Sequence, residues 1–134
     1  MTDYAATALG LTHFAVGASA LISPRFTASI FYLQYHPTSS IIARLFGCRE
    51  LLVGWNVFSS ATPSTSQGLE KKRWAVGFAN LMNGIDVIST LMEWIKSDYQ
   101  DVGAGLGALG AATLLGLGLW SMRYEESKVS RKGL

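Results

Sequence analysis

The sequence has few charged residues, few prolines and almost no cysteine. Lys, Arg, Asp and Glu make up 15% of its 134 residues, against about 25% in an ordinary soluble domain. The single cysteine, Cys48, excludes an internal disulfide. With only two histidines besides, the chain lacks the ligands of a Cys/His zinc site. We therefore expect neither a disulfide scaffold nor a metal centre.

The charge also excludes nucleic-acid binding. The formal net charge is +2, and no face interleaves basic and aromatic residues as a phosphate backbone requires. Apolar residues are abundant instead: 49% of the chain is hydrophobic and 14 residues are glycine, with a mean hydropathy of +0.27. A chain of this length forms one domain. It is either a membrane protein or an unusually apolar soluble helical domain.

Four apolar segments run through the chain, at about 4–22, 40–61, 74–95 and 102–122. Each is close to the ~20 residues with which a helix crosses ~30 Å of hydrocarbon. Aromatic rings favour the membrane interface, and four of them mark segment ends: Trp74, Trp94, Trp120 and Tyr124. We predict an all-α fold, a four-transmembrane-helix bundle in a single membrane domain. A charged C-terminal tail at 123–134 follows it.

The basic residues are distributed unevenly among the connections. Seven of the eleven lie in the loop between the second and third segments and in the tail: Lys71, Lys72, Arg73, Arg123, Lys128, Arg131 and Lys132. The other two connections hold only Arg25 and Lys96. Four crossings place both termini and the middle loop on one side, which the positive-inside rule assigns to the cytoplasm. We predict a multi-pass integral membrane protein, in the endoplasmic reticulum if the cell is eukaryotic, with the lipid bilayer as a partner.

The first segment is expected to be retained rather than cleaved. It lacks the positive n-region of a signal peptide, and its Ala18-Ser19-Ala20 sequence lies inside the apolar run. The connection at 23–39 that follows is rich in aromatic and aliphatic residues. Three interpretations stay open for it: a short interfacial helix, a flap over a cavity, or a loop packed on the bundle.

The second segment carries side chains that are costly in a bilayer, namely Arg44, Arg49, Glu50 and Asn56. A charge near mid-bilayer costs at least ~2.5–3.5 kcal/mol on insertion scales, so such residues face the bundle interior, a partner or a cavity. Arg49 and Asn56 are one heptad apart and share a helix face. Glu50 lies about 100° round from Arg49, so we expect the two not to pair with each other. Each then needs a partner from another helix.

The third segment supplies candidate partners. A polar stripe follows one side of it, comprising Asn80, Asn83, Asp86, Thr90 and Glu93. Asp86 is near the middle of the segment and is the natural partner of Arg49, whereas Glu93 is near the end and reaches the headgroups.

Glycines predict close helix packing in the first and fourth segments. His13 lies between Gly10 and Gly17, on a small-residue face that lets another helix approach. In the fourth segment Gly103 and Gly107 form a G-x-x-x-G pattern, which favours packing within the chain or a homo-oligomer through that face. The same segment contains a literal G-x-G-x-x-G, but no strand precedes it, so it is not a dinucleotide site. We expect no cofactor.

Two interpretations of the ionisable residues stay open. In the structural one, Arg49, Glu50 and Asp86 form a buried ion-pair network that fixes helix register. In the functional one they line a pocket open to lipid, where a desolvated carboxyl acts as an acid. Two carboxyls in unlike settings divide acid and base roles, which suits proton transfer, isomerisation or cyclisation of a lipophilic substrate. The same residue types are equally compatible with binding alone.

The chain also resembles a known family. The segments GASALISP, GCRELLVGW and NGIDVI are similar to those of small four-helix membrane proteins of fungi and bacteria, catalogued as a domain of unknown function. The resemblance covers about residues 7–122, and its most specific parts are Arg49-Glu50 followed by Gly54, and Asp86. It implies a polytopic four-helix membrane bundle. Some fungal relatives occur in secondary-metabolite pathways, where small cofactor-free membrane proteins cyclise or isomerise lipophilic intermediates.

Two functions follow as hypotheses. The first is a cofactor-free membrane isomerase or cyclase acting on a hydrophobic small molecule. Glu50 and Asp86 would transfer protons in it and Arg49 would stabilise an anion. The polar groups that would bind the substrate are His13, Asn56, Asn80, Asn83 and Thr90. The alternative is a non-catalytic accessory, binding or transport subunit.

Overall fold

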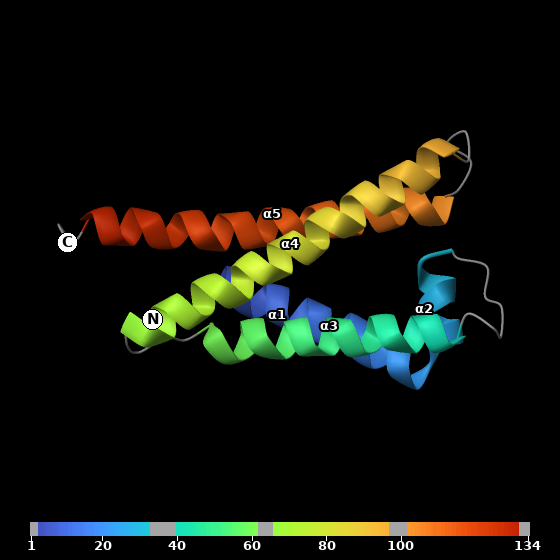
Figure 1. Ribbon diagram of the computed structural model, residues 1–134, viewed down its shortest axis with the longest axis horizontal. Helices are drawn as coiled ribbons and strands as arrows, with labels where there is room; N and C mark the ends of the chain where they lie inside the picture. Colours follow the sequence, from blue (N-terminus) through green and yellow to red (C-terminus); the bar gives the residue numbers. More distant parts are fainter. Residues whose placement is uncertain (1–2, 33–39, 62–65, 97–101, 132–134) are drawn as a thin grey trace.

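The computed structural model describes residues 3–32, 40–61, 66–96 and 102–131 (Figure 1). Throughout these ranges the chain forms helices joined by short turns, without a strand. The helices are α1 (Tyr4–Ile22), α2 (Pro24–Ile30), α3 (Ser40–Ser60), α4 (Ser66–Lys96) and α5 (Val102–Arg131). The predicted all-α class is therefore confirmed for the described part of the chain.

Three helices, α1, α4 and α5, are long and apolar enough to cross a membrane. Their outer surfaces carry large apolar side chains, and Ile22, Trp74 and Leu109 are 84%, 75% and 69% exposed. Soluble monomers rarely expose broad contiguous apolar surface. This exposure is consistent with an integral membrane protein.

The helix bounds differ from the apolar segments at α4 and α5. α4 begins at Ser66 rather than near Trp74, and α5 continues to Arg131 rather than ending near Met122. The added turns are rich in Lys, Arg and Glu, which are good helix formers although they are not apolar. Hydropathy locates only the apolar part of such a helix. The charged tail is helical as well, up to Arg131.

The aromatic connection after α1 contains the short helix α2. Ser23 ends α1, since its N–H bonds to the Ser19 carbonyl, and Pro24 starts α2 where a missing N–H costs nothing. Thr27 of α2 donates to Ser19 Oγ at 3.1 Å, which fastens α2 to α1. The rest of that connection, at 33–39, lies outside the described residues.

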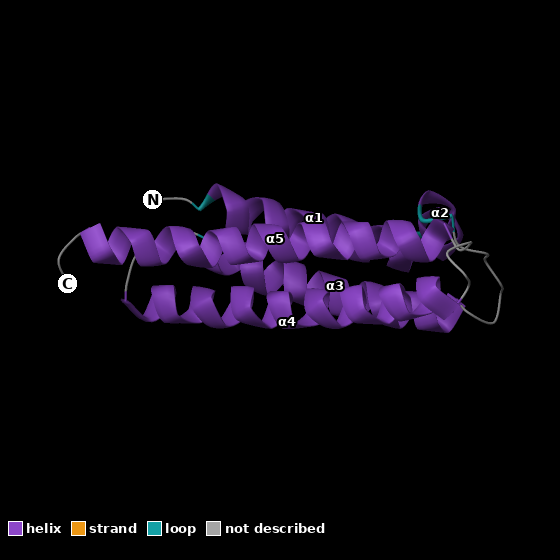
Figure 2. Cartoon of the chain, turned by 90° about the horizontal axis from the view of Figure 1, so that it is seen from above, coloured by secondary structure: helices purple, strands orange, loops and turns teal. Residues whose placement is uncertain are grey.

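The long helices form two antiparallel pairs, α1 with α3 and α4 with α5, and α4 crosses the first pair obliquely (Figure 1). Viewed from above, α1 and α5 lie in one layer and α3 and α4 in the other (Figure 2). The start of α1, the end of α3, the start of α4 and the end of α5 lie at one end of the molecule. We call this the terminal end. The helix α2 lies at the opposite end.

Glycine explains the close contact of α1 with α3. Gly10 and Gly17 of α1 face Gly54 and Gly47 of α3, backbone against backbone. A Cβ placed on Gly54 would lie 2.6 Å from the Phe14 nitrogen and 2.8 Å from the Gly10 carbonyl oxygen. The expected small-residue face around His13 is thus confirmed, and its partner is a matching pair of glycines on α3.

In the α4–α5 pair the glycines of α5 meet side chains of α4 rather than its backbone. A Cβ on Gly107 would lie 3.3 Å from the Thr90 methyl carbon, so this part of the Gly103 and Gly107 face lies against α4 of the same chain. Packing within the chain is therefore observed there, and the homo-oligomer through this face stays a prediction.

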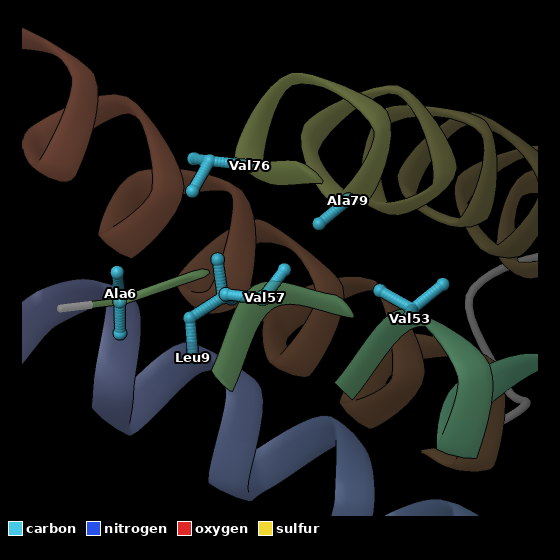
Figure 3. Close-up of a cluster of buried hydrophobic side chains, with 7 residues drawn as sticks. Ala6, Leu9, Val53, Val57, Val76 and Ala79 are labelled. Carbon is cyan, nitrogen blue, oxygen red and sulfur yellow. The ribbon is translucent and has the colours of Figure 1, made fainter. Parts of the chain in front are cut away.

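The apolar core lies near the terminal end, where the four long helices meet (Figure 3). Its buried members are mostly alanine and valine: Ala6, Leu9, Val53, Val57, Ala61, Val76 and Ala79. Leu114, Leu117 and Met122 of α5 pack against them. Small side chains permit short interhelical distances, which is how bundles in lipid gain van der Waals contact.

Candidate functional site

A chain of polar side chains crosses the bundle from α1 through α3 to α4. It runs in the order Asn83, His13, Glu50, Arg49, Asp86. We call these five residues the ion network. Its members come to one place because the glycine contact brings α1 against α3 and because Asn83 and Asp86 lie on one face of α4.

The inner half of the ion network is fully enclosed. His13 Nδ1 lies 2.5 Å from Glu50 Oε2, and Asn83 Nδ2 lies 3.3 Å from His13 Nε2. His13, Glu50 and Asn83 are 1%, 3% and 1% exposed, respectively. Both ring nitrogens of His13 and both oxygens of Glu50 have partners in the protein. Neither residue can therefore touch a molecule outside the protein in this arrangement.

The outer half of the ion network is open on one side. Arg49 binds Asp86 through two parallel hydrogen bonds, Nη1 to Oδ1 at 3.1 Å and Nη2 to Oδ2 at 2.7 Å. Such forked pairs are strong and directional. The Arg49 and Asp86 side chains remain 32% and 28% exposed, and the Phe46 ring lies beneath the guanidinium at 4.9 Å. The predicted Arg49–Asp86 pairing is confirmed.

The prediction that Arg49 and Glu50 cannot pair is wrong. Arg49 donates to Glu50 Oε1 from Nε at 3.0 Å and from Nη2 at 2.7 Å. The helical-wheel argument compares Cβ directions, and these do differ by about 100°. The long arginine side chain, however, bends back toward the interhelical space, where its fork meets the shorter glutamate. One guanidinium thereby joins both carboxylates.

The ion network carries unequal charge. It contains one guanidinium and two carboxylates, so it holds an excess negative charge when His13 is neutral. Uncompensated charge in a low-dielectric interior is costly, and the carboxylate of the network that lies partly open to the outside is Asp86.

The other predicted site residues lie away from the ion network. Asn56 is exposed on α3 and donates to its own Leu52 carbonyl at 2.8 Å. Asn80 is buried against Gly118 of α5 and donates to Met122 Sδ at 3.4 Å. Asn56 shares a heptad face with Arg49, but its amide bonds within α3, whereas Arg49 bonds to Asp86 of α4.

Two more members of the polar stripe have roles outside the ion network. Thr90 donates to the Asp86 carbonyl at 2.6 Å, as hydroxyls within helices commonly do. Glu93 is exposed near the end of α4, and its position at the headgroups stays a prediction.

Two hollows lie on the described surface. One is lined by Asn56 of α3 and by Lys71, Trp74, Ala75 and Phe78 of α4. The other is an apolar hollow between α4 and α5, beside Leu91, Trp94 and Leu106. Neither contains a residue of the ion network. The exposed sides of Arg49 and Asp86 are thus the accessible part of that network.

A second buried polar cluster at the terminal end was not foreseen. Asp3 caps α1, because its Oδ1 accepts from the Ala5 and Ala6 nitrogens at 3.0 and 3.2 Å. Its Oδ2 accepts from Lys72 Nζ and Ser121 Oγ, both at 2.6 Å. We call Asp3, Lys72 and Ser121 the terminal cluster. It joins α1, α4 and α5, and Lys72 is only 2% exposed.

The terminal cluster sets the ionisation of Asp3. Burial by itself would raise the pKa of the Asp3 carboxyl. Hydrogen bonds from Lys72, Ser121 and the Ala6 N–H, together with the positive charge of Lys72, outweigh burial and hold that pKa below its usual value. Asp3 is therefore ionised near neutral pH and paired with Lys72.

Spacing along α4 could have identified Lys72 as an inward residue. Lys72, Val76, Ala79, Asn83 and Asp86 recur at intervals of three and four, which places all of them on the buried face. The positive-inside argument counts Lys72 among the solvated loop cations, whereas the structure buries it.

No protein-family model, no curated protein and no solved structure matches this chain.

Proposed function

We propose that this chain is a multi-pass integral membrane protein in which α1, α3, α4 and α5 all cross the bilayer, with the terminal end on the cytoplasmic side. The length of α1, 19 residues, corresponds to about 28 Å at 1.5 Å per residue, close to the hydrocarbon thickness. The basic residues of the tail and of the α3–α4 region support this orientation.

The helix α3 carries Arg44, Arg49 and Glu50, which are costly to place in a bilayer. Arg49 and Glu50 pair with each other inside the bundle, and Asp86 and His13 also bond to them. Arg44 is exposed within the first turns of α3, where a long side chain extends to the interface. The penalty for placing this helix in lipid is thereby reduced.

We further propose that the exposed side of the Arg49–Asp86 pair binds the polar group of a lipophilic small molecule. The observation that carries this proposal is the asymmetry of the ion network, enclosed at His13 and Glu50 but about one third exposed at Arg49 and Asp86. A charged pair partly exposed among apolar side chains is the expected place for a polar headgroup or carbonyl. Intramembrane ionisable residues are functional candidates for this reason.

The charge count favours a second candidate, acid–base catalysis without a cofactor. The exposed carboxylate of Asp86 can take a proton from one position of a bound molecule and return it to another, which would serve an isomerisation or a cyclisation. Asp86 is then the catalytic residue, because it is the exposed carboxyl. Glu50 and His13 act behind it as positioning residues, contrary to the expectation that Glu50 acts directly.

One experiment tests both functions. The wild-type chain, Asp86→Asn and the control Arg44→Gln are purified from membranes, and their retained apolar compounds are identified by mass spectrometry. Asn keeps one acceptor oxygen for Arg49 but replaces the other by an NH2 group and removes the charge, whereas Arg44 is exposed on the same helix as Arg49. We expect Asp86→Asn to lose a retained compound that both other proteins keep. Equal retention by all three would refute binding at this pair.

The catalytic candidate is decided by incubating that retained compound with each protein in deuterated water. Acid–base chemistry predicts deuterium incorporation with wild type and with Arg44→Gln, and none with Asp86→Asn. Binding without incorporation by wild type would leave a binding protein and refute catalysis. Unfolding temperatures measured on the same samples show whether Asp86→Asn is folded.

A further inference from the structure

The hollow lined by Asn56, Lys71, Trp74, Ala75 and Phe78 lies apart from the ion network and has a different chemical character. Its volume is about 320 Å³. Lys71, Trp74, Ala75 and Phe78 follow one another at helical spacing on one side of α4. Asn56 of α3 forms the facing part of its lining.

The lining changes character along α4. Lys71 stands toward the terminal end, and Phe78 stands roughly 10 Å farther along the axis, at 1.5 Å per residue. Trp74 and Phe78 are 75% and 52% exposed, so their rings are available to a ligand. The Nδ2 of Asn56 donates to the Leu52 carbonyl, so the amide contributes its side-chain oxygen to the lining as an acceptor.

The charges of this region are divided between two roles. Lys72 points inward to Asp3 in the terminal cluster, whereas Lys71 and Arg73 are exposed. Of the two exposed cations, Lys71 lines the hollow. The hollow therefore combines one cation, one amide acceptor and two aromatic rings that lead toward the middle of α4.

We propose that this hollow binds an anionic phospholipid of the cytoplasmic leaflet, with the phosphate on Lys71 and the first acyl chain along Trp74 and Phe78. Charge complementarity at Lys71 and the aromatic floor identify a lipid rather than a soluble anion. Tryptophan is enriched at the depth where headgroup meets acyl chain, and cytoplasmic leaflets carry anionic lipids. This inference rests on the proposed membrane integration and orientation.

The test uses Trp74 as the reporter. The full chain with Trp55, Trp94 and Trp120 replaced by Phe is reconstituted into phosphatidylcholine vesicles. These contain equal fractions of brominated phosphatidylglycerol or brominated phosphatidylcholine, whose acyl chains quench tryptophan on contact. We expect phosphatidylglycerol to be preferred at Trp74 by about fivefold, which corresponds to about 1 kcal/mol for one basic residue near an anionic surface.

Two variants and one competitor make the result specific. Lys71→Gln should abolish the preference, and Arg73→Gln, which removes the same charge two residues farther along α4, should leave it unchanged. Lys71→Arg should restore it. Inorganic phosphate in excess should not reduce it, because the acyl chain contributes to binding.

Four outcomes would overturn the lipid site. Equal quenching by the two brominated lipids would show that the integrated protein has no headgroup preference. Equal loss in Lys71→Gln and Arg73→Gln would indicate diffuse surface charge. Displacement by phosphate alone would indicate an anion site. Absence of quenching by either lipid would refute membrane integration itself, which distinguishes failure of the proposed function from failure of this inference.

Discussion

Replacing glycine by alanine is expected to destabilise the protein at the contact between α1 and α3, and to stabilise it at an open position on α4. Replacing Gly54 by Ala places a Cβ 2.6 Å from the Phe14 nitrogen, whereas ordinary contacts begin at 3.4 Å. The two helices must therefore separate locally by roughly 0.8 Å. A gap of that size forfeits about a quarter to a half of the attraction between facing atoms.

The magnitude follows from two opposing effects. Alanine favours a helix over glycine by about 1 kcal/mol, while overpacking costs about 1–3 kcal/mol and more where backbone opposes backbone. We expect Gly54→Ala to lower the free energy of unfolding by about 2 kcal/mol. The matched control is Gly84→Ala on α4, where an added Cβ meets no atom within 4 Å. It should raise the free energy by up to about 1 kcal/mol.

The assay is equilibrium unfolding in mixed micelles, followed by tryptophan fluorescence. Trp55 stands next to the substituted glycine and reports separation of the two helices. If Gly54→Ala proved as stable as Gly84→Ala, the close backbone contact would not exist in the folded protein, and the placement of His13 against Glu50 would lose its support.

Three further predictions concern the buried charges. Lys72→Met should cost about 3–5 kcal/mol, because it leaves Asp3 buried without its cation. The exposed Lys71→Met should cost nothing measurable, and equal effects on thermal unfolding would contradict the terminal cluster. Because the Asp3 pKa is lowered in the folded state, its contribution to stability is complete above about pH 4, near the unfolded value, and is lost as the pH falls through the folded pKa. The difference between wild type and Asp3→Asn in unfolding temperature should shrink accordingly in acid, and a constant difference would refute this. Glu50→Gln should destabilise more than Asp86→Asn, because Glu50 is enclosed. The reverse order in a denaturant titration would place the open side of the ion network at Glu50.

Residue spacing along single helices predicted much of the ion network. The apolar runs located every long helix, and the polar stripe of α4 pointed Asp86 toward Arg49, which the structure confirms. These inferences succeeded because the helical period fixes which residues share a face. The seven-residue spacing of Gly47 and Gly54 matches that of Gly10 and Gly17, so even the glycine contact left a signal in the sequence.

Spacing failed where side-chain length or helix position decided the contact. The Arg49 side chain bends to reach Glu50. A helical wheel shows only the direction of each Cβ and not how a long side chain can bend. Asn56 shares the heptad face of Arg49 but bonds to its own helix and stays exposed. The charge of Lys72 suggested solvent, although its spacing pointed inward to Asp3.

The sequence by itself determined the helical class, the positions of the long apolar helices and the faces they bury, because composition and period are local properties of the chain. Only the tertiary structure decided which charges meet and which remain accessible. Asp3, Lys72 and Ser121 are brought together from three helices, and Arg49 rather than Glu50 stands at the open side. Such contacts depend on how closely helices cross, and here backbone packing at four glycines sets that distance.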